Sequence, residues 1–107
     1  MKTIKKVEIK PVFVEWMPEP ENMEQGILYI SKRCLAIHLC LCGCGEQVVT
    51  PLDEIVTESE KIVTEMPPGG WILTEKRNKI SMTPSIGNYE FPCKSHYIIT
   101  NNVANFV

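Results

Sequence analysis

The feature that most constrains this chain is the placement of its cysteines and histidines. Three cysteines alternate with other residues directly after a histidine, in the run His38-Leu-Cys-Leu-Cys-Gly-Cys-Gly45. Another cysteine and the only other histidine stand near the C-terminus, as Cys93-Lys-Ser-His96. Thiolate and imidazole are ligands that zinc prefers, usually four at a time. The spacing therefore predicts that two distant segments meet at one zinc ion.

The candidate donors allow two ligand sets. These are Cys40, Cys42, Cys44 and Cys93, or Cys42, Cys44, Cys93 and His96. Alternate residues of a strand share a face, so Cys40 and Cys42 can face one ion, and Gly43 can turn the chain to bring Cys44 round. The surplus of thiolates favours a closed, structural zinc over a catalytic zinc with an open position. The competing interpretation is a group of buried free thiols, and Cys34 is expected to be a plain core residue.

The composition is that of one globular domain, residues 1–107, with 44% hydrophobic and 22% charged residues. The net charge of −2 gives no reason to expect nucleic acid as a partner. Charged residues interrupt the start of the chain, and no apolar run approaches the length of a membrane span. Five cysteines is an odd number, and the Cys-x-Cys spacings at 40, 42 and 44 make poor disulfides. We therefore expect a cytoplasmic protein with metal-bound thiolates and no membrane partner.

Short runs of β-branched and aromatic residues predict strands along most of the chain. They lie at 4–16, 26–30, 34–40, 46–50, 71–74, 80–83, 97–100 and 103–107. We expect a mainly β, antiparallel, barrel-like sheet of about six to eight strands with at most one short helix. Pro51 is expected to end the strand at 46–50.

Two details of this sheet are predicted more closely. Residues 26–30 and 34–40 form a hairpin whose second strand carries the chemistry on the face of Ala36, His38 and Cys40, and the core on the other face. Residues 52–66 show a loose helical spacing of apolar positions, although their many β-branched residues argue against a helix. A helix stays open for this segment, and Pro67-Pro-Gly-Gly70 would end it.

Ser85 lies between a proline and a glycine in Thr83-Pro-Ser-Ile-Gly-Asn88, where a tight connection is expected. Serine becomes a nucleophile when a base takes its proton and donors hold the oxyanion. His96 or His38 could be the base, and the backbone amides around Ile86 and Gly87 could hold the oxyanion.

The alternative is that Ser85 caps a turn, that Asn88 has a left-handed conformation and that His96 is the fourth zinc ligand. Ser95 is the weaker nucleophile candidate, since neighbours in a strand point to opposite faces.

Several motifs together resemble one small bacterial family. They are Gly26-Ile-Leu-Tyr-Ile-Ser31, the run from His38 to Gly45, Val49-Thr-Pro-Leu52, Trp71-x-Leu73, Pro84-Ser-Ile-Gly-Asn88 and Pro92-Cys-x-Ser-His-Tyr97. Members of the family occur beside bacterial ubiquitin-like conjugation genes, with E1-like and E2-like proteins, and have been proposed to be peptidases. The resemblance makes residues 26–107 the family core and residues 1–25 N-terminal edge strands and a connector. In place of a short connector, this chain has a longer acidic segment between Leu52 and Trp71.

The resemblance implies that His38, the clustered cysteines, Ser85, Cys93 and His96 form one site. The function expected from it is a zinc-stabilised serine-type peptidase or deconjugating hydrolase that acts on a ubiquitin-like protein or its conjugates. The alternative is a non-catalytic zinc-binding interaction module in the same pathway, which would bind the ubiquitin-like protein or its E1-like and E2-like enzymes. A redox or metal-buffering protein is a third interpretation of the cysteines.

Overall fold

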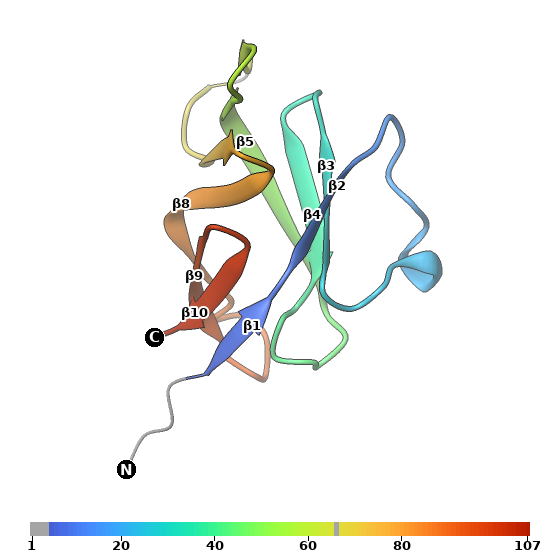
Figure 1. Ribbon diagram of the computed structural model, residues 1–107. Coiled ribbons are helices and arrows are strands. Elements are labelled where there is room, and N and C mark those ends of the chain that lie inside the picture. The colour runs from blue at the N-terminus through green and yellow to red at the C-terminus, as the bar shows by residue number, and fades with distance from the viewer. Residues whose placement is uncertain (1–4, 66) are drawn as a thin grey trace.

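The computed structural model describes residues 5–65 and 67–107, and strands make up most of it (Figure 1). The strands are β1 (Lys6–Glu8), β2 (Lys10–Phe13), β3 (Ile27–Ser31), β4 (Leu35–Leu39), β5 (Gln47–Val56), β6 (Lys61–Val63), β7 (Trp71–Lys76), β8 (Lys79–Gly87), β9 (His96–Thr100) and β10 (Val103–Phe106). Within the described residues the one helical element is a 3-10 turn, η1 (Pro20–Asn22). The mainly β prediction is confirmed, with more strands than expected. Ile4 and Met66, at the ends of two predicted elements, lie outside the described residues.

The strands form one sheet that nearly closes on itself. Its order is β1-β10-β9-β8-β7-β5-β4-β3-β2, with β6 paired to β5. Only Ile9 separates β1 from β2, so one N-terminal segment pairs with β10 through β1 and with β3 through β2. Figure 1 shows this blue segment crossing between the two halves of the fold. The barrel-like prediction is confirmed, and the pairing is antiparallel except between β2 and β3 and between β5 and β7.

The β3–β4 hairpin forms as predicted, but β5 does not end at Pro51. The N–H of Leu52 donates to the carbonyl of Cys34, 2.8 Å away. Hydrogen-bonded pairs recur at every second residue of an antiparallel ladder, so the backbone of Pro51 faces away from β4. Proline costs no ladder hydrogen bond at such a position. The strand therefore runs on to Val56.

The helix considered for residues 52–66 is absent from the described part of that segment, and the helix prediction is wrong. The end of β5 turns back into β6 through residues 57–60, where the Thr57 hydroxyl accepts the N–H groups of Ser59 and Glu60. β-Branched residues such as Ile55 and Ile62, which pair across these strands, favour extended backbone. Strand pairing therefore prevails over the loose helical spacing.

The faces of β4 are not divided as predicted. Ala36 and Cys40 lie in the main core inside the barrel, and His38 beside them is also buried. Ile37, on the opposite face, packs with Met23 and Tyr29 in a second apolar cluster. The chain between β2 and β3 covers this outer face, so both sides of β4 are buried. The chemistry-bearing face is the inner face.

Candidate active site and metal centre

β8 and β9 bring Ser85 and His96 together. Gly87 pairs with His96 across the two strands, and residues two apart on a strand share a face. Nε2 of His96 lies 2.6 Å from Oγ of Ser85, a hydrogen-bond distance suited to proton transfer. Both side chains are half-buried. The predicted pairing of this serine with a histidine is thus present in the geometry.

Ser85 lies within β8 instead of in a tight connection. The pairing of β8 with β9 shifts in register between Met82 and Ile86, and the Thr83–Pro84 peptide bond there is cis. Such bulges re-aim side chains while the strand continues. The serine therefore stands on a strand, next to an irregularity in its ladder.

Tyr89 completes a chain of hydrogen bonds that the sequence did not reveal. Its hydroxyl lies 2.9 Å from Nδ1 of His96, on the ring edge opposite Ser85. If Nε2 accepts the proton of Ser85, Nδ1 carries the other proton and donates it to the phenol oxygen. The Tyr89 hydroxyl is thus placed to hold the imidazole ring with Nε2 toward Ser85. Its place directly after the Pro84–Asn88 motif was the one signal that could have pointed to it.

The open edge of β8 lies beside the hydrogen-bonded chain of Ser85, His96 and Tyr89. The N–H of Asn88 donates to the carbonyl of Ser95, 2.7 Å away. By the alternation of an antiparallel ladder, Ile86 faces its partner Tyr97, whereas the backbone of Gly87 faces away from β9. The amide of Gly87 is thus available to a ligand, and the amide of Ile86 is not.

A cavity of about 350 Å³ adjoins this edge, and we call it the β5–β8 cleft. Its lining consists of Val48, Val49, Trp71 and residues 86–91. The indole Nε1 of Trp71 donates to the carbonyl of Ser85, 3.3 Å away. Tyr89 belongs both to the cleft and to the hydrogen-bonded chain, so the cleft lies next to the serine–histidine pair.

Four thiols form a cluster that can hold a metal ion. The Sγ atoms of Cys40, Cys42, Cys44 and Cys93 all lie within 4.8 Å of one another. Cys40 is 3.4 Å from Cys42 and 3.8 Å from Cys93, and Cys44 is 3.7 Å from Cys93. Tetrahedral zinc with bonds of about 2.3 Å places its sulfur ligands about 3.8 Å apart. The distances therefore fit a four-thiolate site.

The cysteines meet through a turn and not through strand alternation. The N–H of Cys40 donates to the carbonyl of Glu46 at 2.7 Å, which closes the β4–β5 hairpin. Gly43 and Gly45 have φ of 91° and 86°, values that favour glycine. The expectation that Cys40 and Cys42 share a strand face is wrong, because β4 ends before them. The predicted role of Gly43 in turning the chain is confirmed.

Polar neighbours of the cluster suit anionic sulfur. The Ser95 hydroxyl lies 3.1 Å from Sγ of Cys40 and 3.5 Å from Sγ of Cys93. Hydrogen bonds from the side chain and backbone of Ser95 lower the pKa of the Cys93 thiol to about 6. Burial raises the pKa of Cys42. A bound cation would allow all four thiols to ionise together.

His38 lies in the core and not beside Ser85. Its side chain is 1% exposed, and its Nε2 lies 2.6 Å from the hydroxyl of Tyr97. Burial lowers its pKa to about 4. The Asn88 side chain approaches the Tyr97 hydroxyl, Ser95 and Cys40, and so connects this buried network to the thiols. No hydrogen bond in the described residues joins His38 to Ser85.

The residues grouped by the family resemblance thus occupy three neighbouring places. Ser85 and His96 form the pair on β8 and β9, the four cysteines form the cluster, and His38 lies in the core. Ser95 contacts the thiols while the adjacent His96 contacts Ser85, which links the cluster to the pair. Neither histidine belongs to the four-thiol cluster.

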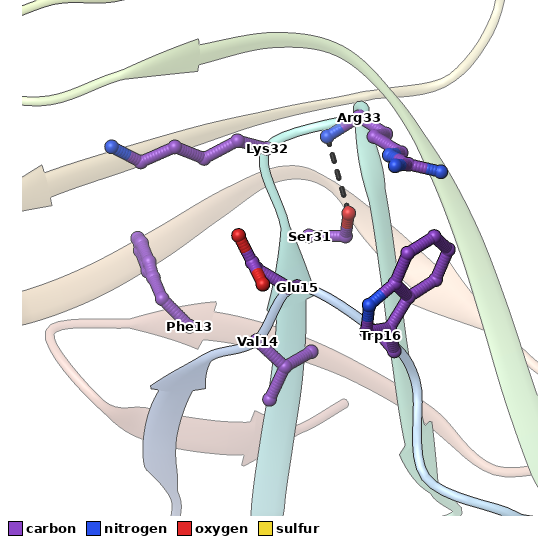
Figure 2. A pocket seen from close by; sticks show the side chains of 7 residues that line it. All are labelled: Phe13, Val14, Glu15, Trp16, Ser31, Lys32 and Arg33. Carbon is purple, nitrogen blue, oxygen red and sulfur yellow. Dashed lines mark hydrogen bonds between the residues drawn. The ribbon is translucent and has the colours of Figure 1, made fainter.

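A second cavity lies at the other end of β4. It measures about 410 Å³ and is lined by Phe13, Val14, Glu15, Trp16, Ser31, Lys32 and Arg33 (Figure 2). The guanidinium of Arg33 stacks 4.5 Å from the ring centre of Trp16. Cys34 is buried at this same end of the strand, as a core residue. None of the predicted catalytic or metal-binding residues lines this cavity.

The fold and the site define a small, mainly β protein. It has a cluster of four cysteines that can hold a metal ion, next to a hydrogen-bonded serine–histidine pair. The sequence model of the family described as "Bacterial ubiquitination-like system serine protease (BubE)" matches residues 13–107. The chain belongs to this family, and the resemblance seen in its motifs is confirmed. The match begins at Phe13, ahead of Gly26.

Searches of curated proteins and of solved structures found no match. In the described part of the chain, no helix has the length and apolar character to cross a membrane.

Proposed function

We propose that this protein is a serine-type hydrolase that cleaves a peptide or isopeptide bond in a ubiquitin-like protein or its conjugates. Membership of a serine protease family of a bacterial ubiquitination-like system supports the reaction class and the pathway. The observation that carries the residue assignment is the 2.6 Å contact between Ser85 and His96, with Tyr89 on the far side of the imidazole. The ubiquitin-like protein and its E1-like and E2-like enzymes are the expected partners, and the cytoplasm is the expected location.

In this proposal Oγ of Ser85 attacks the scissile carbonyl carbon while its proton moves to Nε2 of His96. The carbonyl oxygen becomes an oxyanion, which the N–H of Gly87 is placed to stabilise. The carbon–nitrogen bond then breaks, and the same proton passes from Nε2 to the leaving nitrogen. Water, deprotonated by His96, hydrolyses the remaining ester and restores the serine.

Tyr89 is a positioning residue in this reaction. Its oxygen accepts a hydrogen bond from Nδ1–H throughout, which keeps Nε2 directed at Ser85 and supports the imidazolium that forms. The phenol is neutral, so it gives less charge stabilisation than the carboxylate of a Ser-His-Asp triad would. Its main contribution is orientation.

The four thiols would hold zinc as a closed structural site. Four protein ligands leave no open position, so the ion would supply a crosslink and no part of the proposed reaction. Cys93 stands three residues before His96, and the crosslink would fix this segment against the β4–β5 turn. The proposed role of the metal is therefore to hold the base in place.

The test uses a biotinylated fluorophosphonate and a ubiquitin-like protein from the same genome that carries a C-terminal peptide extension. Attack by Ser85 on the probe forms an oxygen–phosphorus bond and releases fluoride. We expect labelling and cleavage by the wild type and neither by Ser85→Ala, with zinc content unchanged. Ser81→Ala is the matched control, since Ser81 lies on the same strand and bonds the N–H of Asn101.

Cleavage by a folded Ser85→Ala variant would refute the serine mechanism. Binding of the ubiquitin-like protein without labelling or cleavage by the wild type would favour the non-catalytic interaction module instead.

A further inference from the structure

The barrel wall lacks a strand next to Ser85. β7 lies between β5 and β8, and it pairs with β5 from Leu52 onward and with β8 only up to Thr83. Because β7 begins at Trp71, no strand in the described residues covers the β7-side edge of β5 before Leu52 or of β8 after Thr83. The sheet therefore opens into a gap in line with β7. The β5–β8 cleft is this gap.

Both walls of the gap present backbone groups toward it. On β8 the ladder with β9 directs the backbone of Gly87 into the gap, and the carbonyl of Ser85 also points there, where it accepts the indole N–H of Trp71. On β5 the hydrogen bond from Cys40 to Glu46 sets the alternation, and it turns the backbone of Gln47 and Val49 away from β4 and into the gap. Two exposed rows of donors and acceptors thus face one another across the cleft, an arrangement that invites strand addition.

The dimensions suit one added strand. Where β7 separates β5 from β8, the flanking strands are two strand spacings apart, about 9.5 Å. The cleft beyond it has a volume of about 350 Å³. Trp71 and Phe91 line it together with Val49, which is 51% exposed. An apolar side chain of a bound strand would find apolar contacts there.

We propose that the substrate binds in the β5–β8 cleft as an extended polypeptide that takes the place of the missing strand. It pairs with the backbone of β5 and β8 together and places an apolar side chain against Trp71 and Phe91. This inference rests on the proposed hydrolase function and names how that function holds its substrate. A chain in this position runs along the strand that carries Ser85. Strand addition supplies affinity through the main chain and selectivity through alternate side chains.

The first experiment measures cleavage of acetylated hexapeptide pools by mass spectrometry and then N-methylates the best peptide, one position at a time. A strand paired on both edges uses the N–H groups of consecutive residues. We therefore expect N-methylation at each of two or more adjacent positions, tested singly, to lower kcat/KM by about tenfold. A peptide held only by one side chain in a pocket would lose activity at a single position.

The second experiment observes binding without catalysis. The same peptide pools are added to ¹⁵N-labelled Ser85→Ala, and the amide signals are followed by NMR. We expect shifts at Val49 and Gly87 and none at Val63. Val49→Asp should lower kcat/KM by about 10- to 200-fold, as expected for the loss of an apolar subsite. Val63→Asp is the matched control, since Val63 is 58% exposed on β6 and does not line this cleft.

The outcomes separate the two proposals. Shifts at Val49 and Gly87 without cleavage by the wild type would uphold strand binding and refute the hydrolase. Cleavage that depends on Ser85 but tolerates backbone N-methylation and Val49→Asp would refute strand binding and uphold the hydrolase. Neither shifts nor cleavage with any pool would refute both.

Discussion

The ring of Tyr89 lies against the backbone of Gly87, where a side chain would collide with it. A Cβ added at Gly87 would be 2.5 Å from Cε2 of Tyr89. Since the hydroxyl of the same tyrosine bonds Nδ1 of His96, the missing side chain at Gly87 allows the imidazole to be held.

We predict that Gly87→Ala displaces Tyr89 and lowers kcat by about tenfold, or ~1.4 kcal/mol, through loss of orientation at His96. Steady-state kinetics on the best hexapeptide from the pools measure this. If the effect passes through the tyrosine, Gly87→Ala and Tyr89→Phe will be strongly non-additive in a double-mutant cycle. Additive effects would mean that Gly87 acts on the substrate alone.

Tyr89→Phe keeps the ring over Gly87 and removes only the hydroxyl. Loss of one neutral hydrogen bond is worth about 0.5–1.5 kcal/mol, so kcat should fall by about 2- to 12-fold. KM should hardly change, because the ring still lines the cleft. An unchanged kcat would remove Tyr89 from the positioning role.

The two histidines should respond differently to replacement by glutamine. His96→Gln removes the proposed base and should lower kcat by at least about a hundredfold, with the fold intact. His38→Gln should leave the kcat of the folded protein within about twofold and cost about 1–3 kcal/mol of unfolding free energy, because it disturbs a buried hydrogen bond with Tyr97. Kinetics and urea denaturation of both variants give these values. A large loss of kcat in folded His38→Gln would restore His38 as a candidate base.

Metal removal should destabilise the protein strongly. A crosslink between Cys44 and Cys93, 49 residues apart, is worth about 4 kcal/mol of chain entropy alone. A chelator should therefore lower Tm, and Cys93→Ser should reduce the zinc found by elemental mass spectrometry. Cys34→Ser is the control, since Cys34 lies at the opposite end of β4 and should leave the zinc content unchanged. Full zinc content in Cys93→Ser would exclude this ligand set.

The strand content and the meeting of the two cysteine-bearing segments follow from sequence alone. β-Branched runs determine extended backbone locally, and four thiols in two motifs leave few other arrangements. Family membership could also be recognised, because its motifs are contiguous strings such as Pro84–Asn88.

Other properties depend on contacts between residues far apart in the chain. The sequence does not distinguish His38 from His96 as the partner of Ser85. The register of β8 on β9 brings His96 to Oγ of Ser85, whereas His38 is buried and hydrogen-bonded to Tyr97. Tyr89 reaches His96 because its ring packs closely on Gly87, and no local sequence pattern predicts that contact. The gap beside Ser85 exists because β7 begins at Trp71, between β5 and β8, which are separated by residues 57–78 in sequence. Local propensity determined the strands of this protein, and only the tertiary pairing of those strands decided which residues face one another across them.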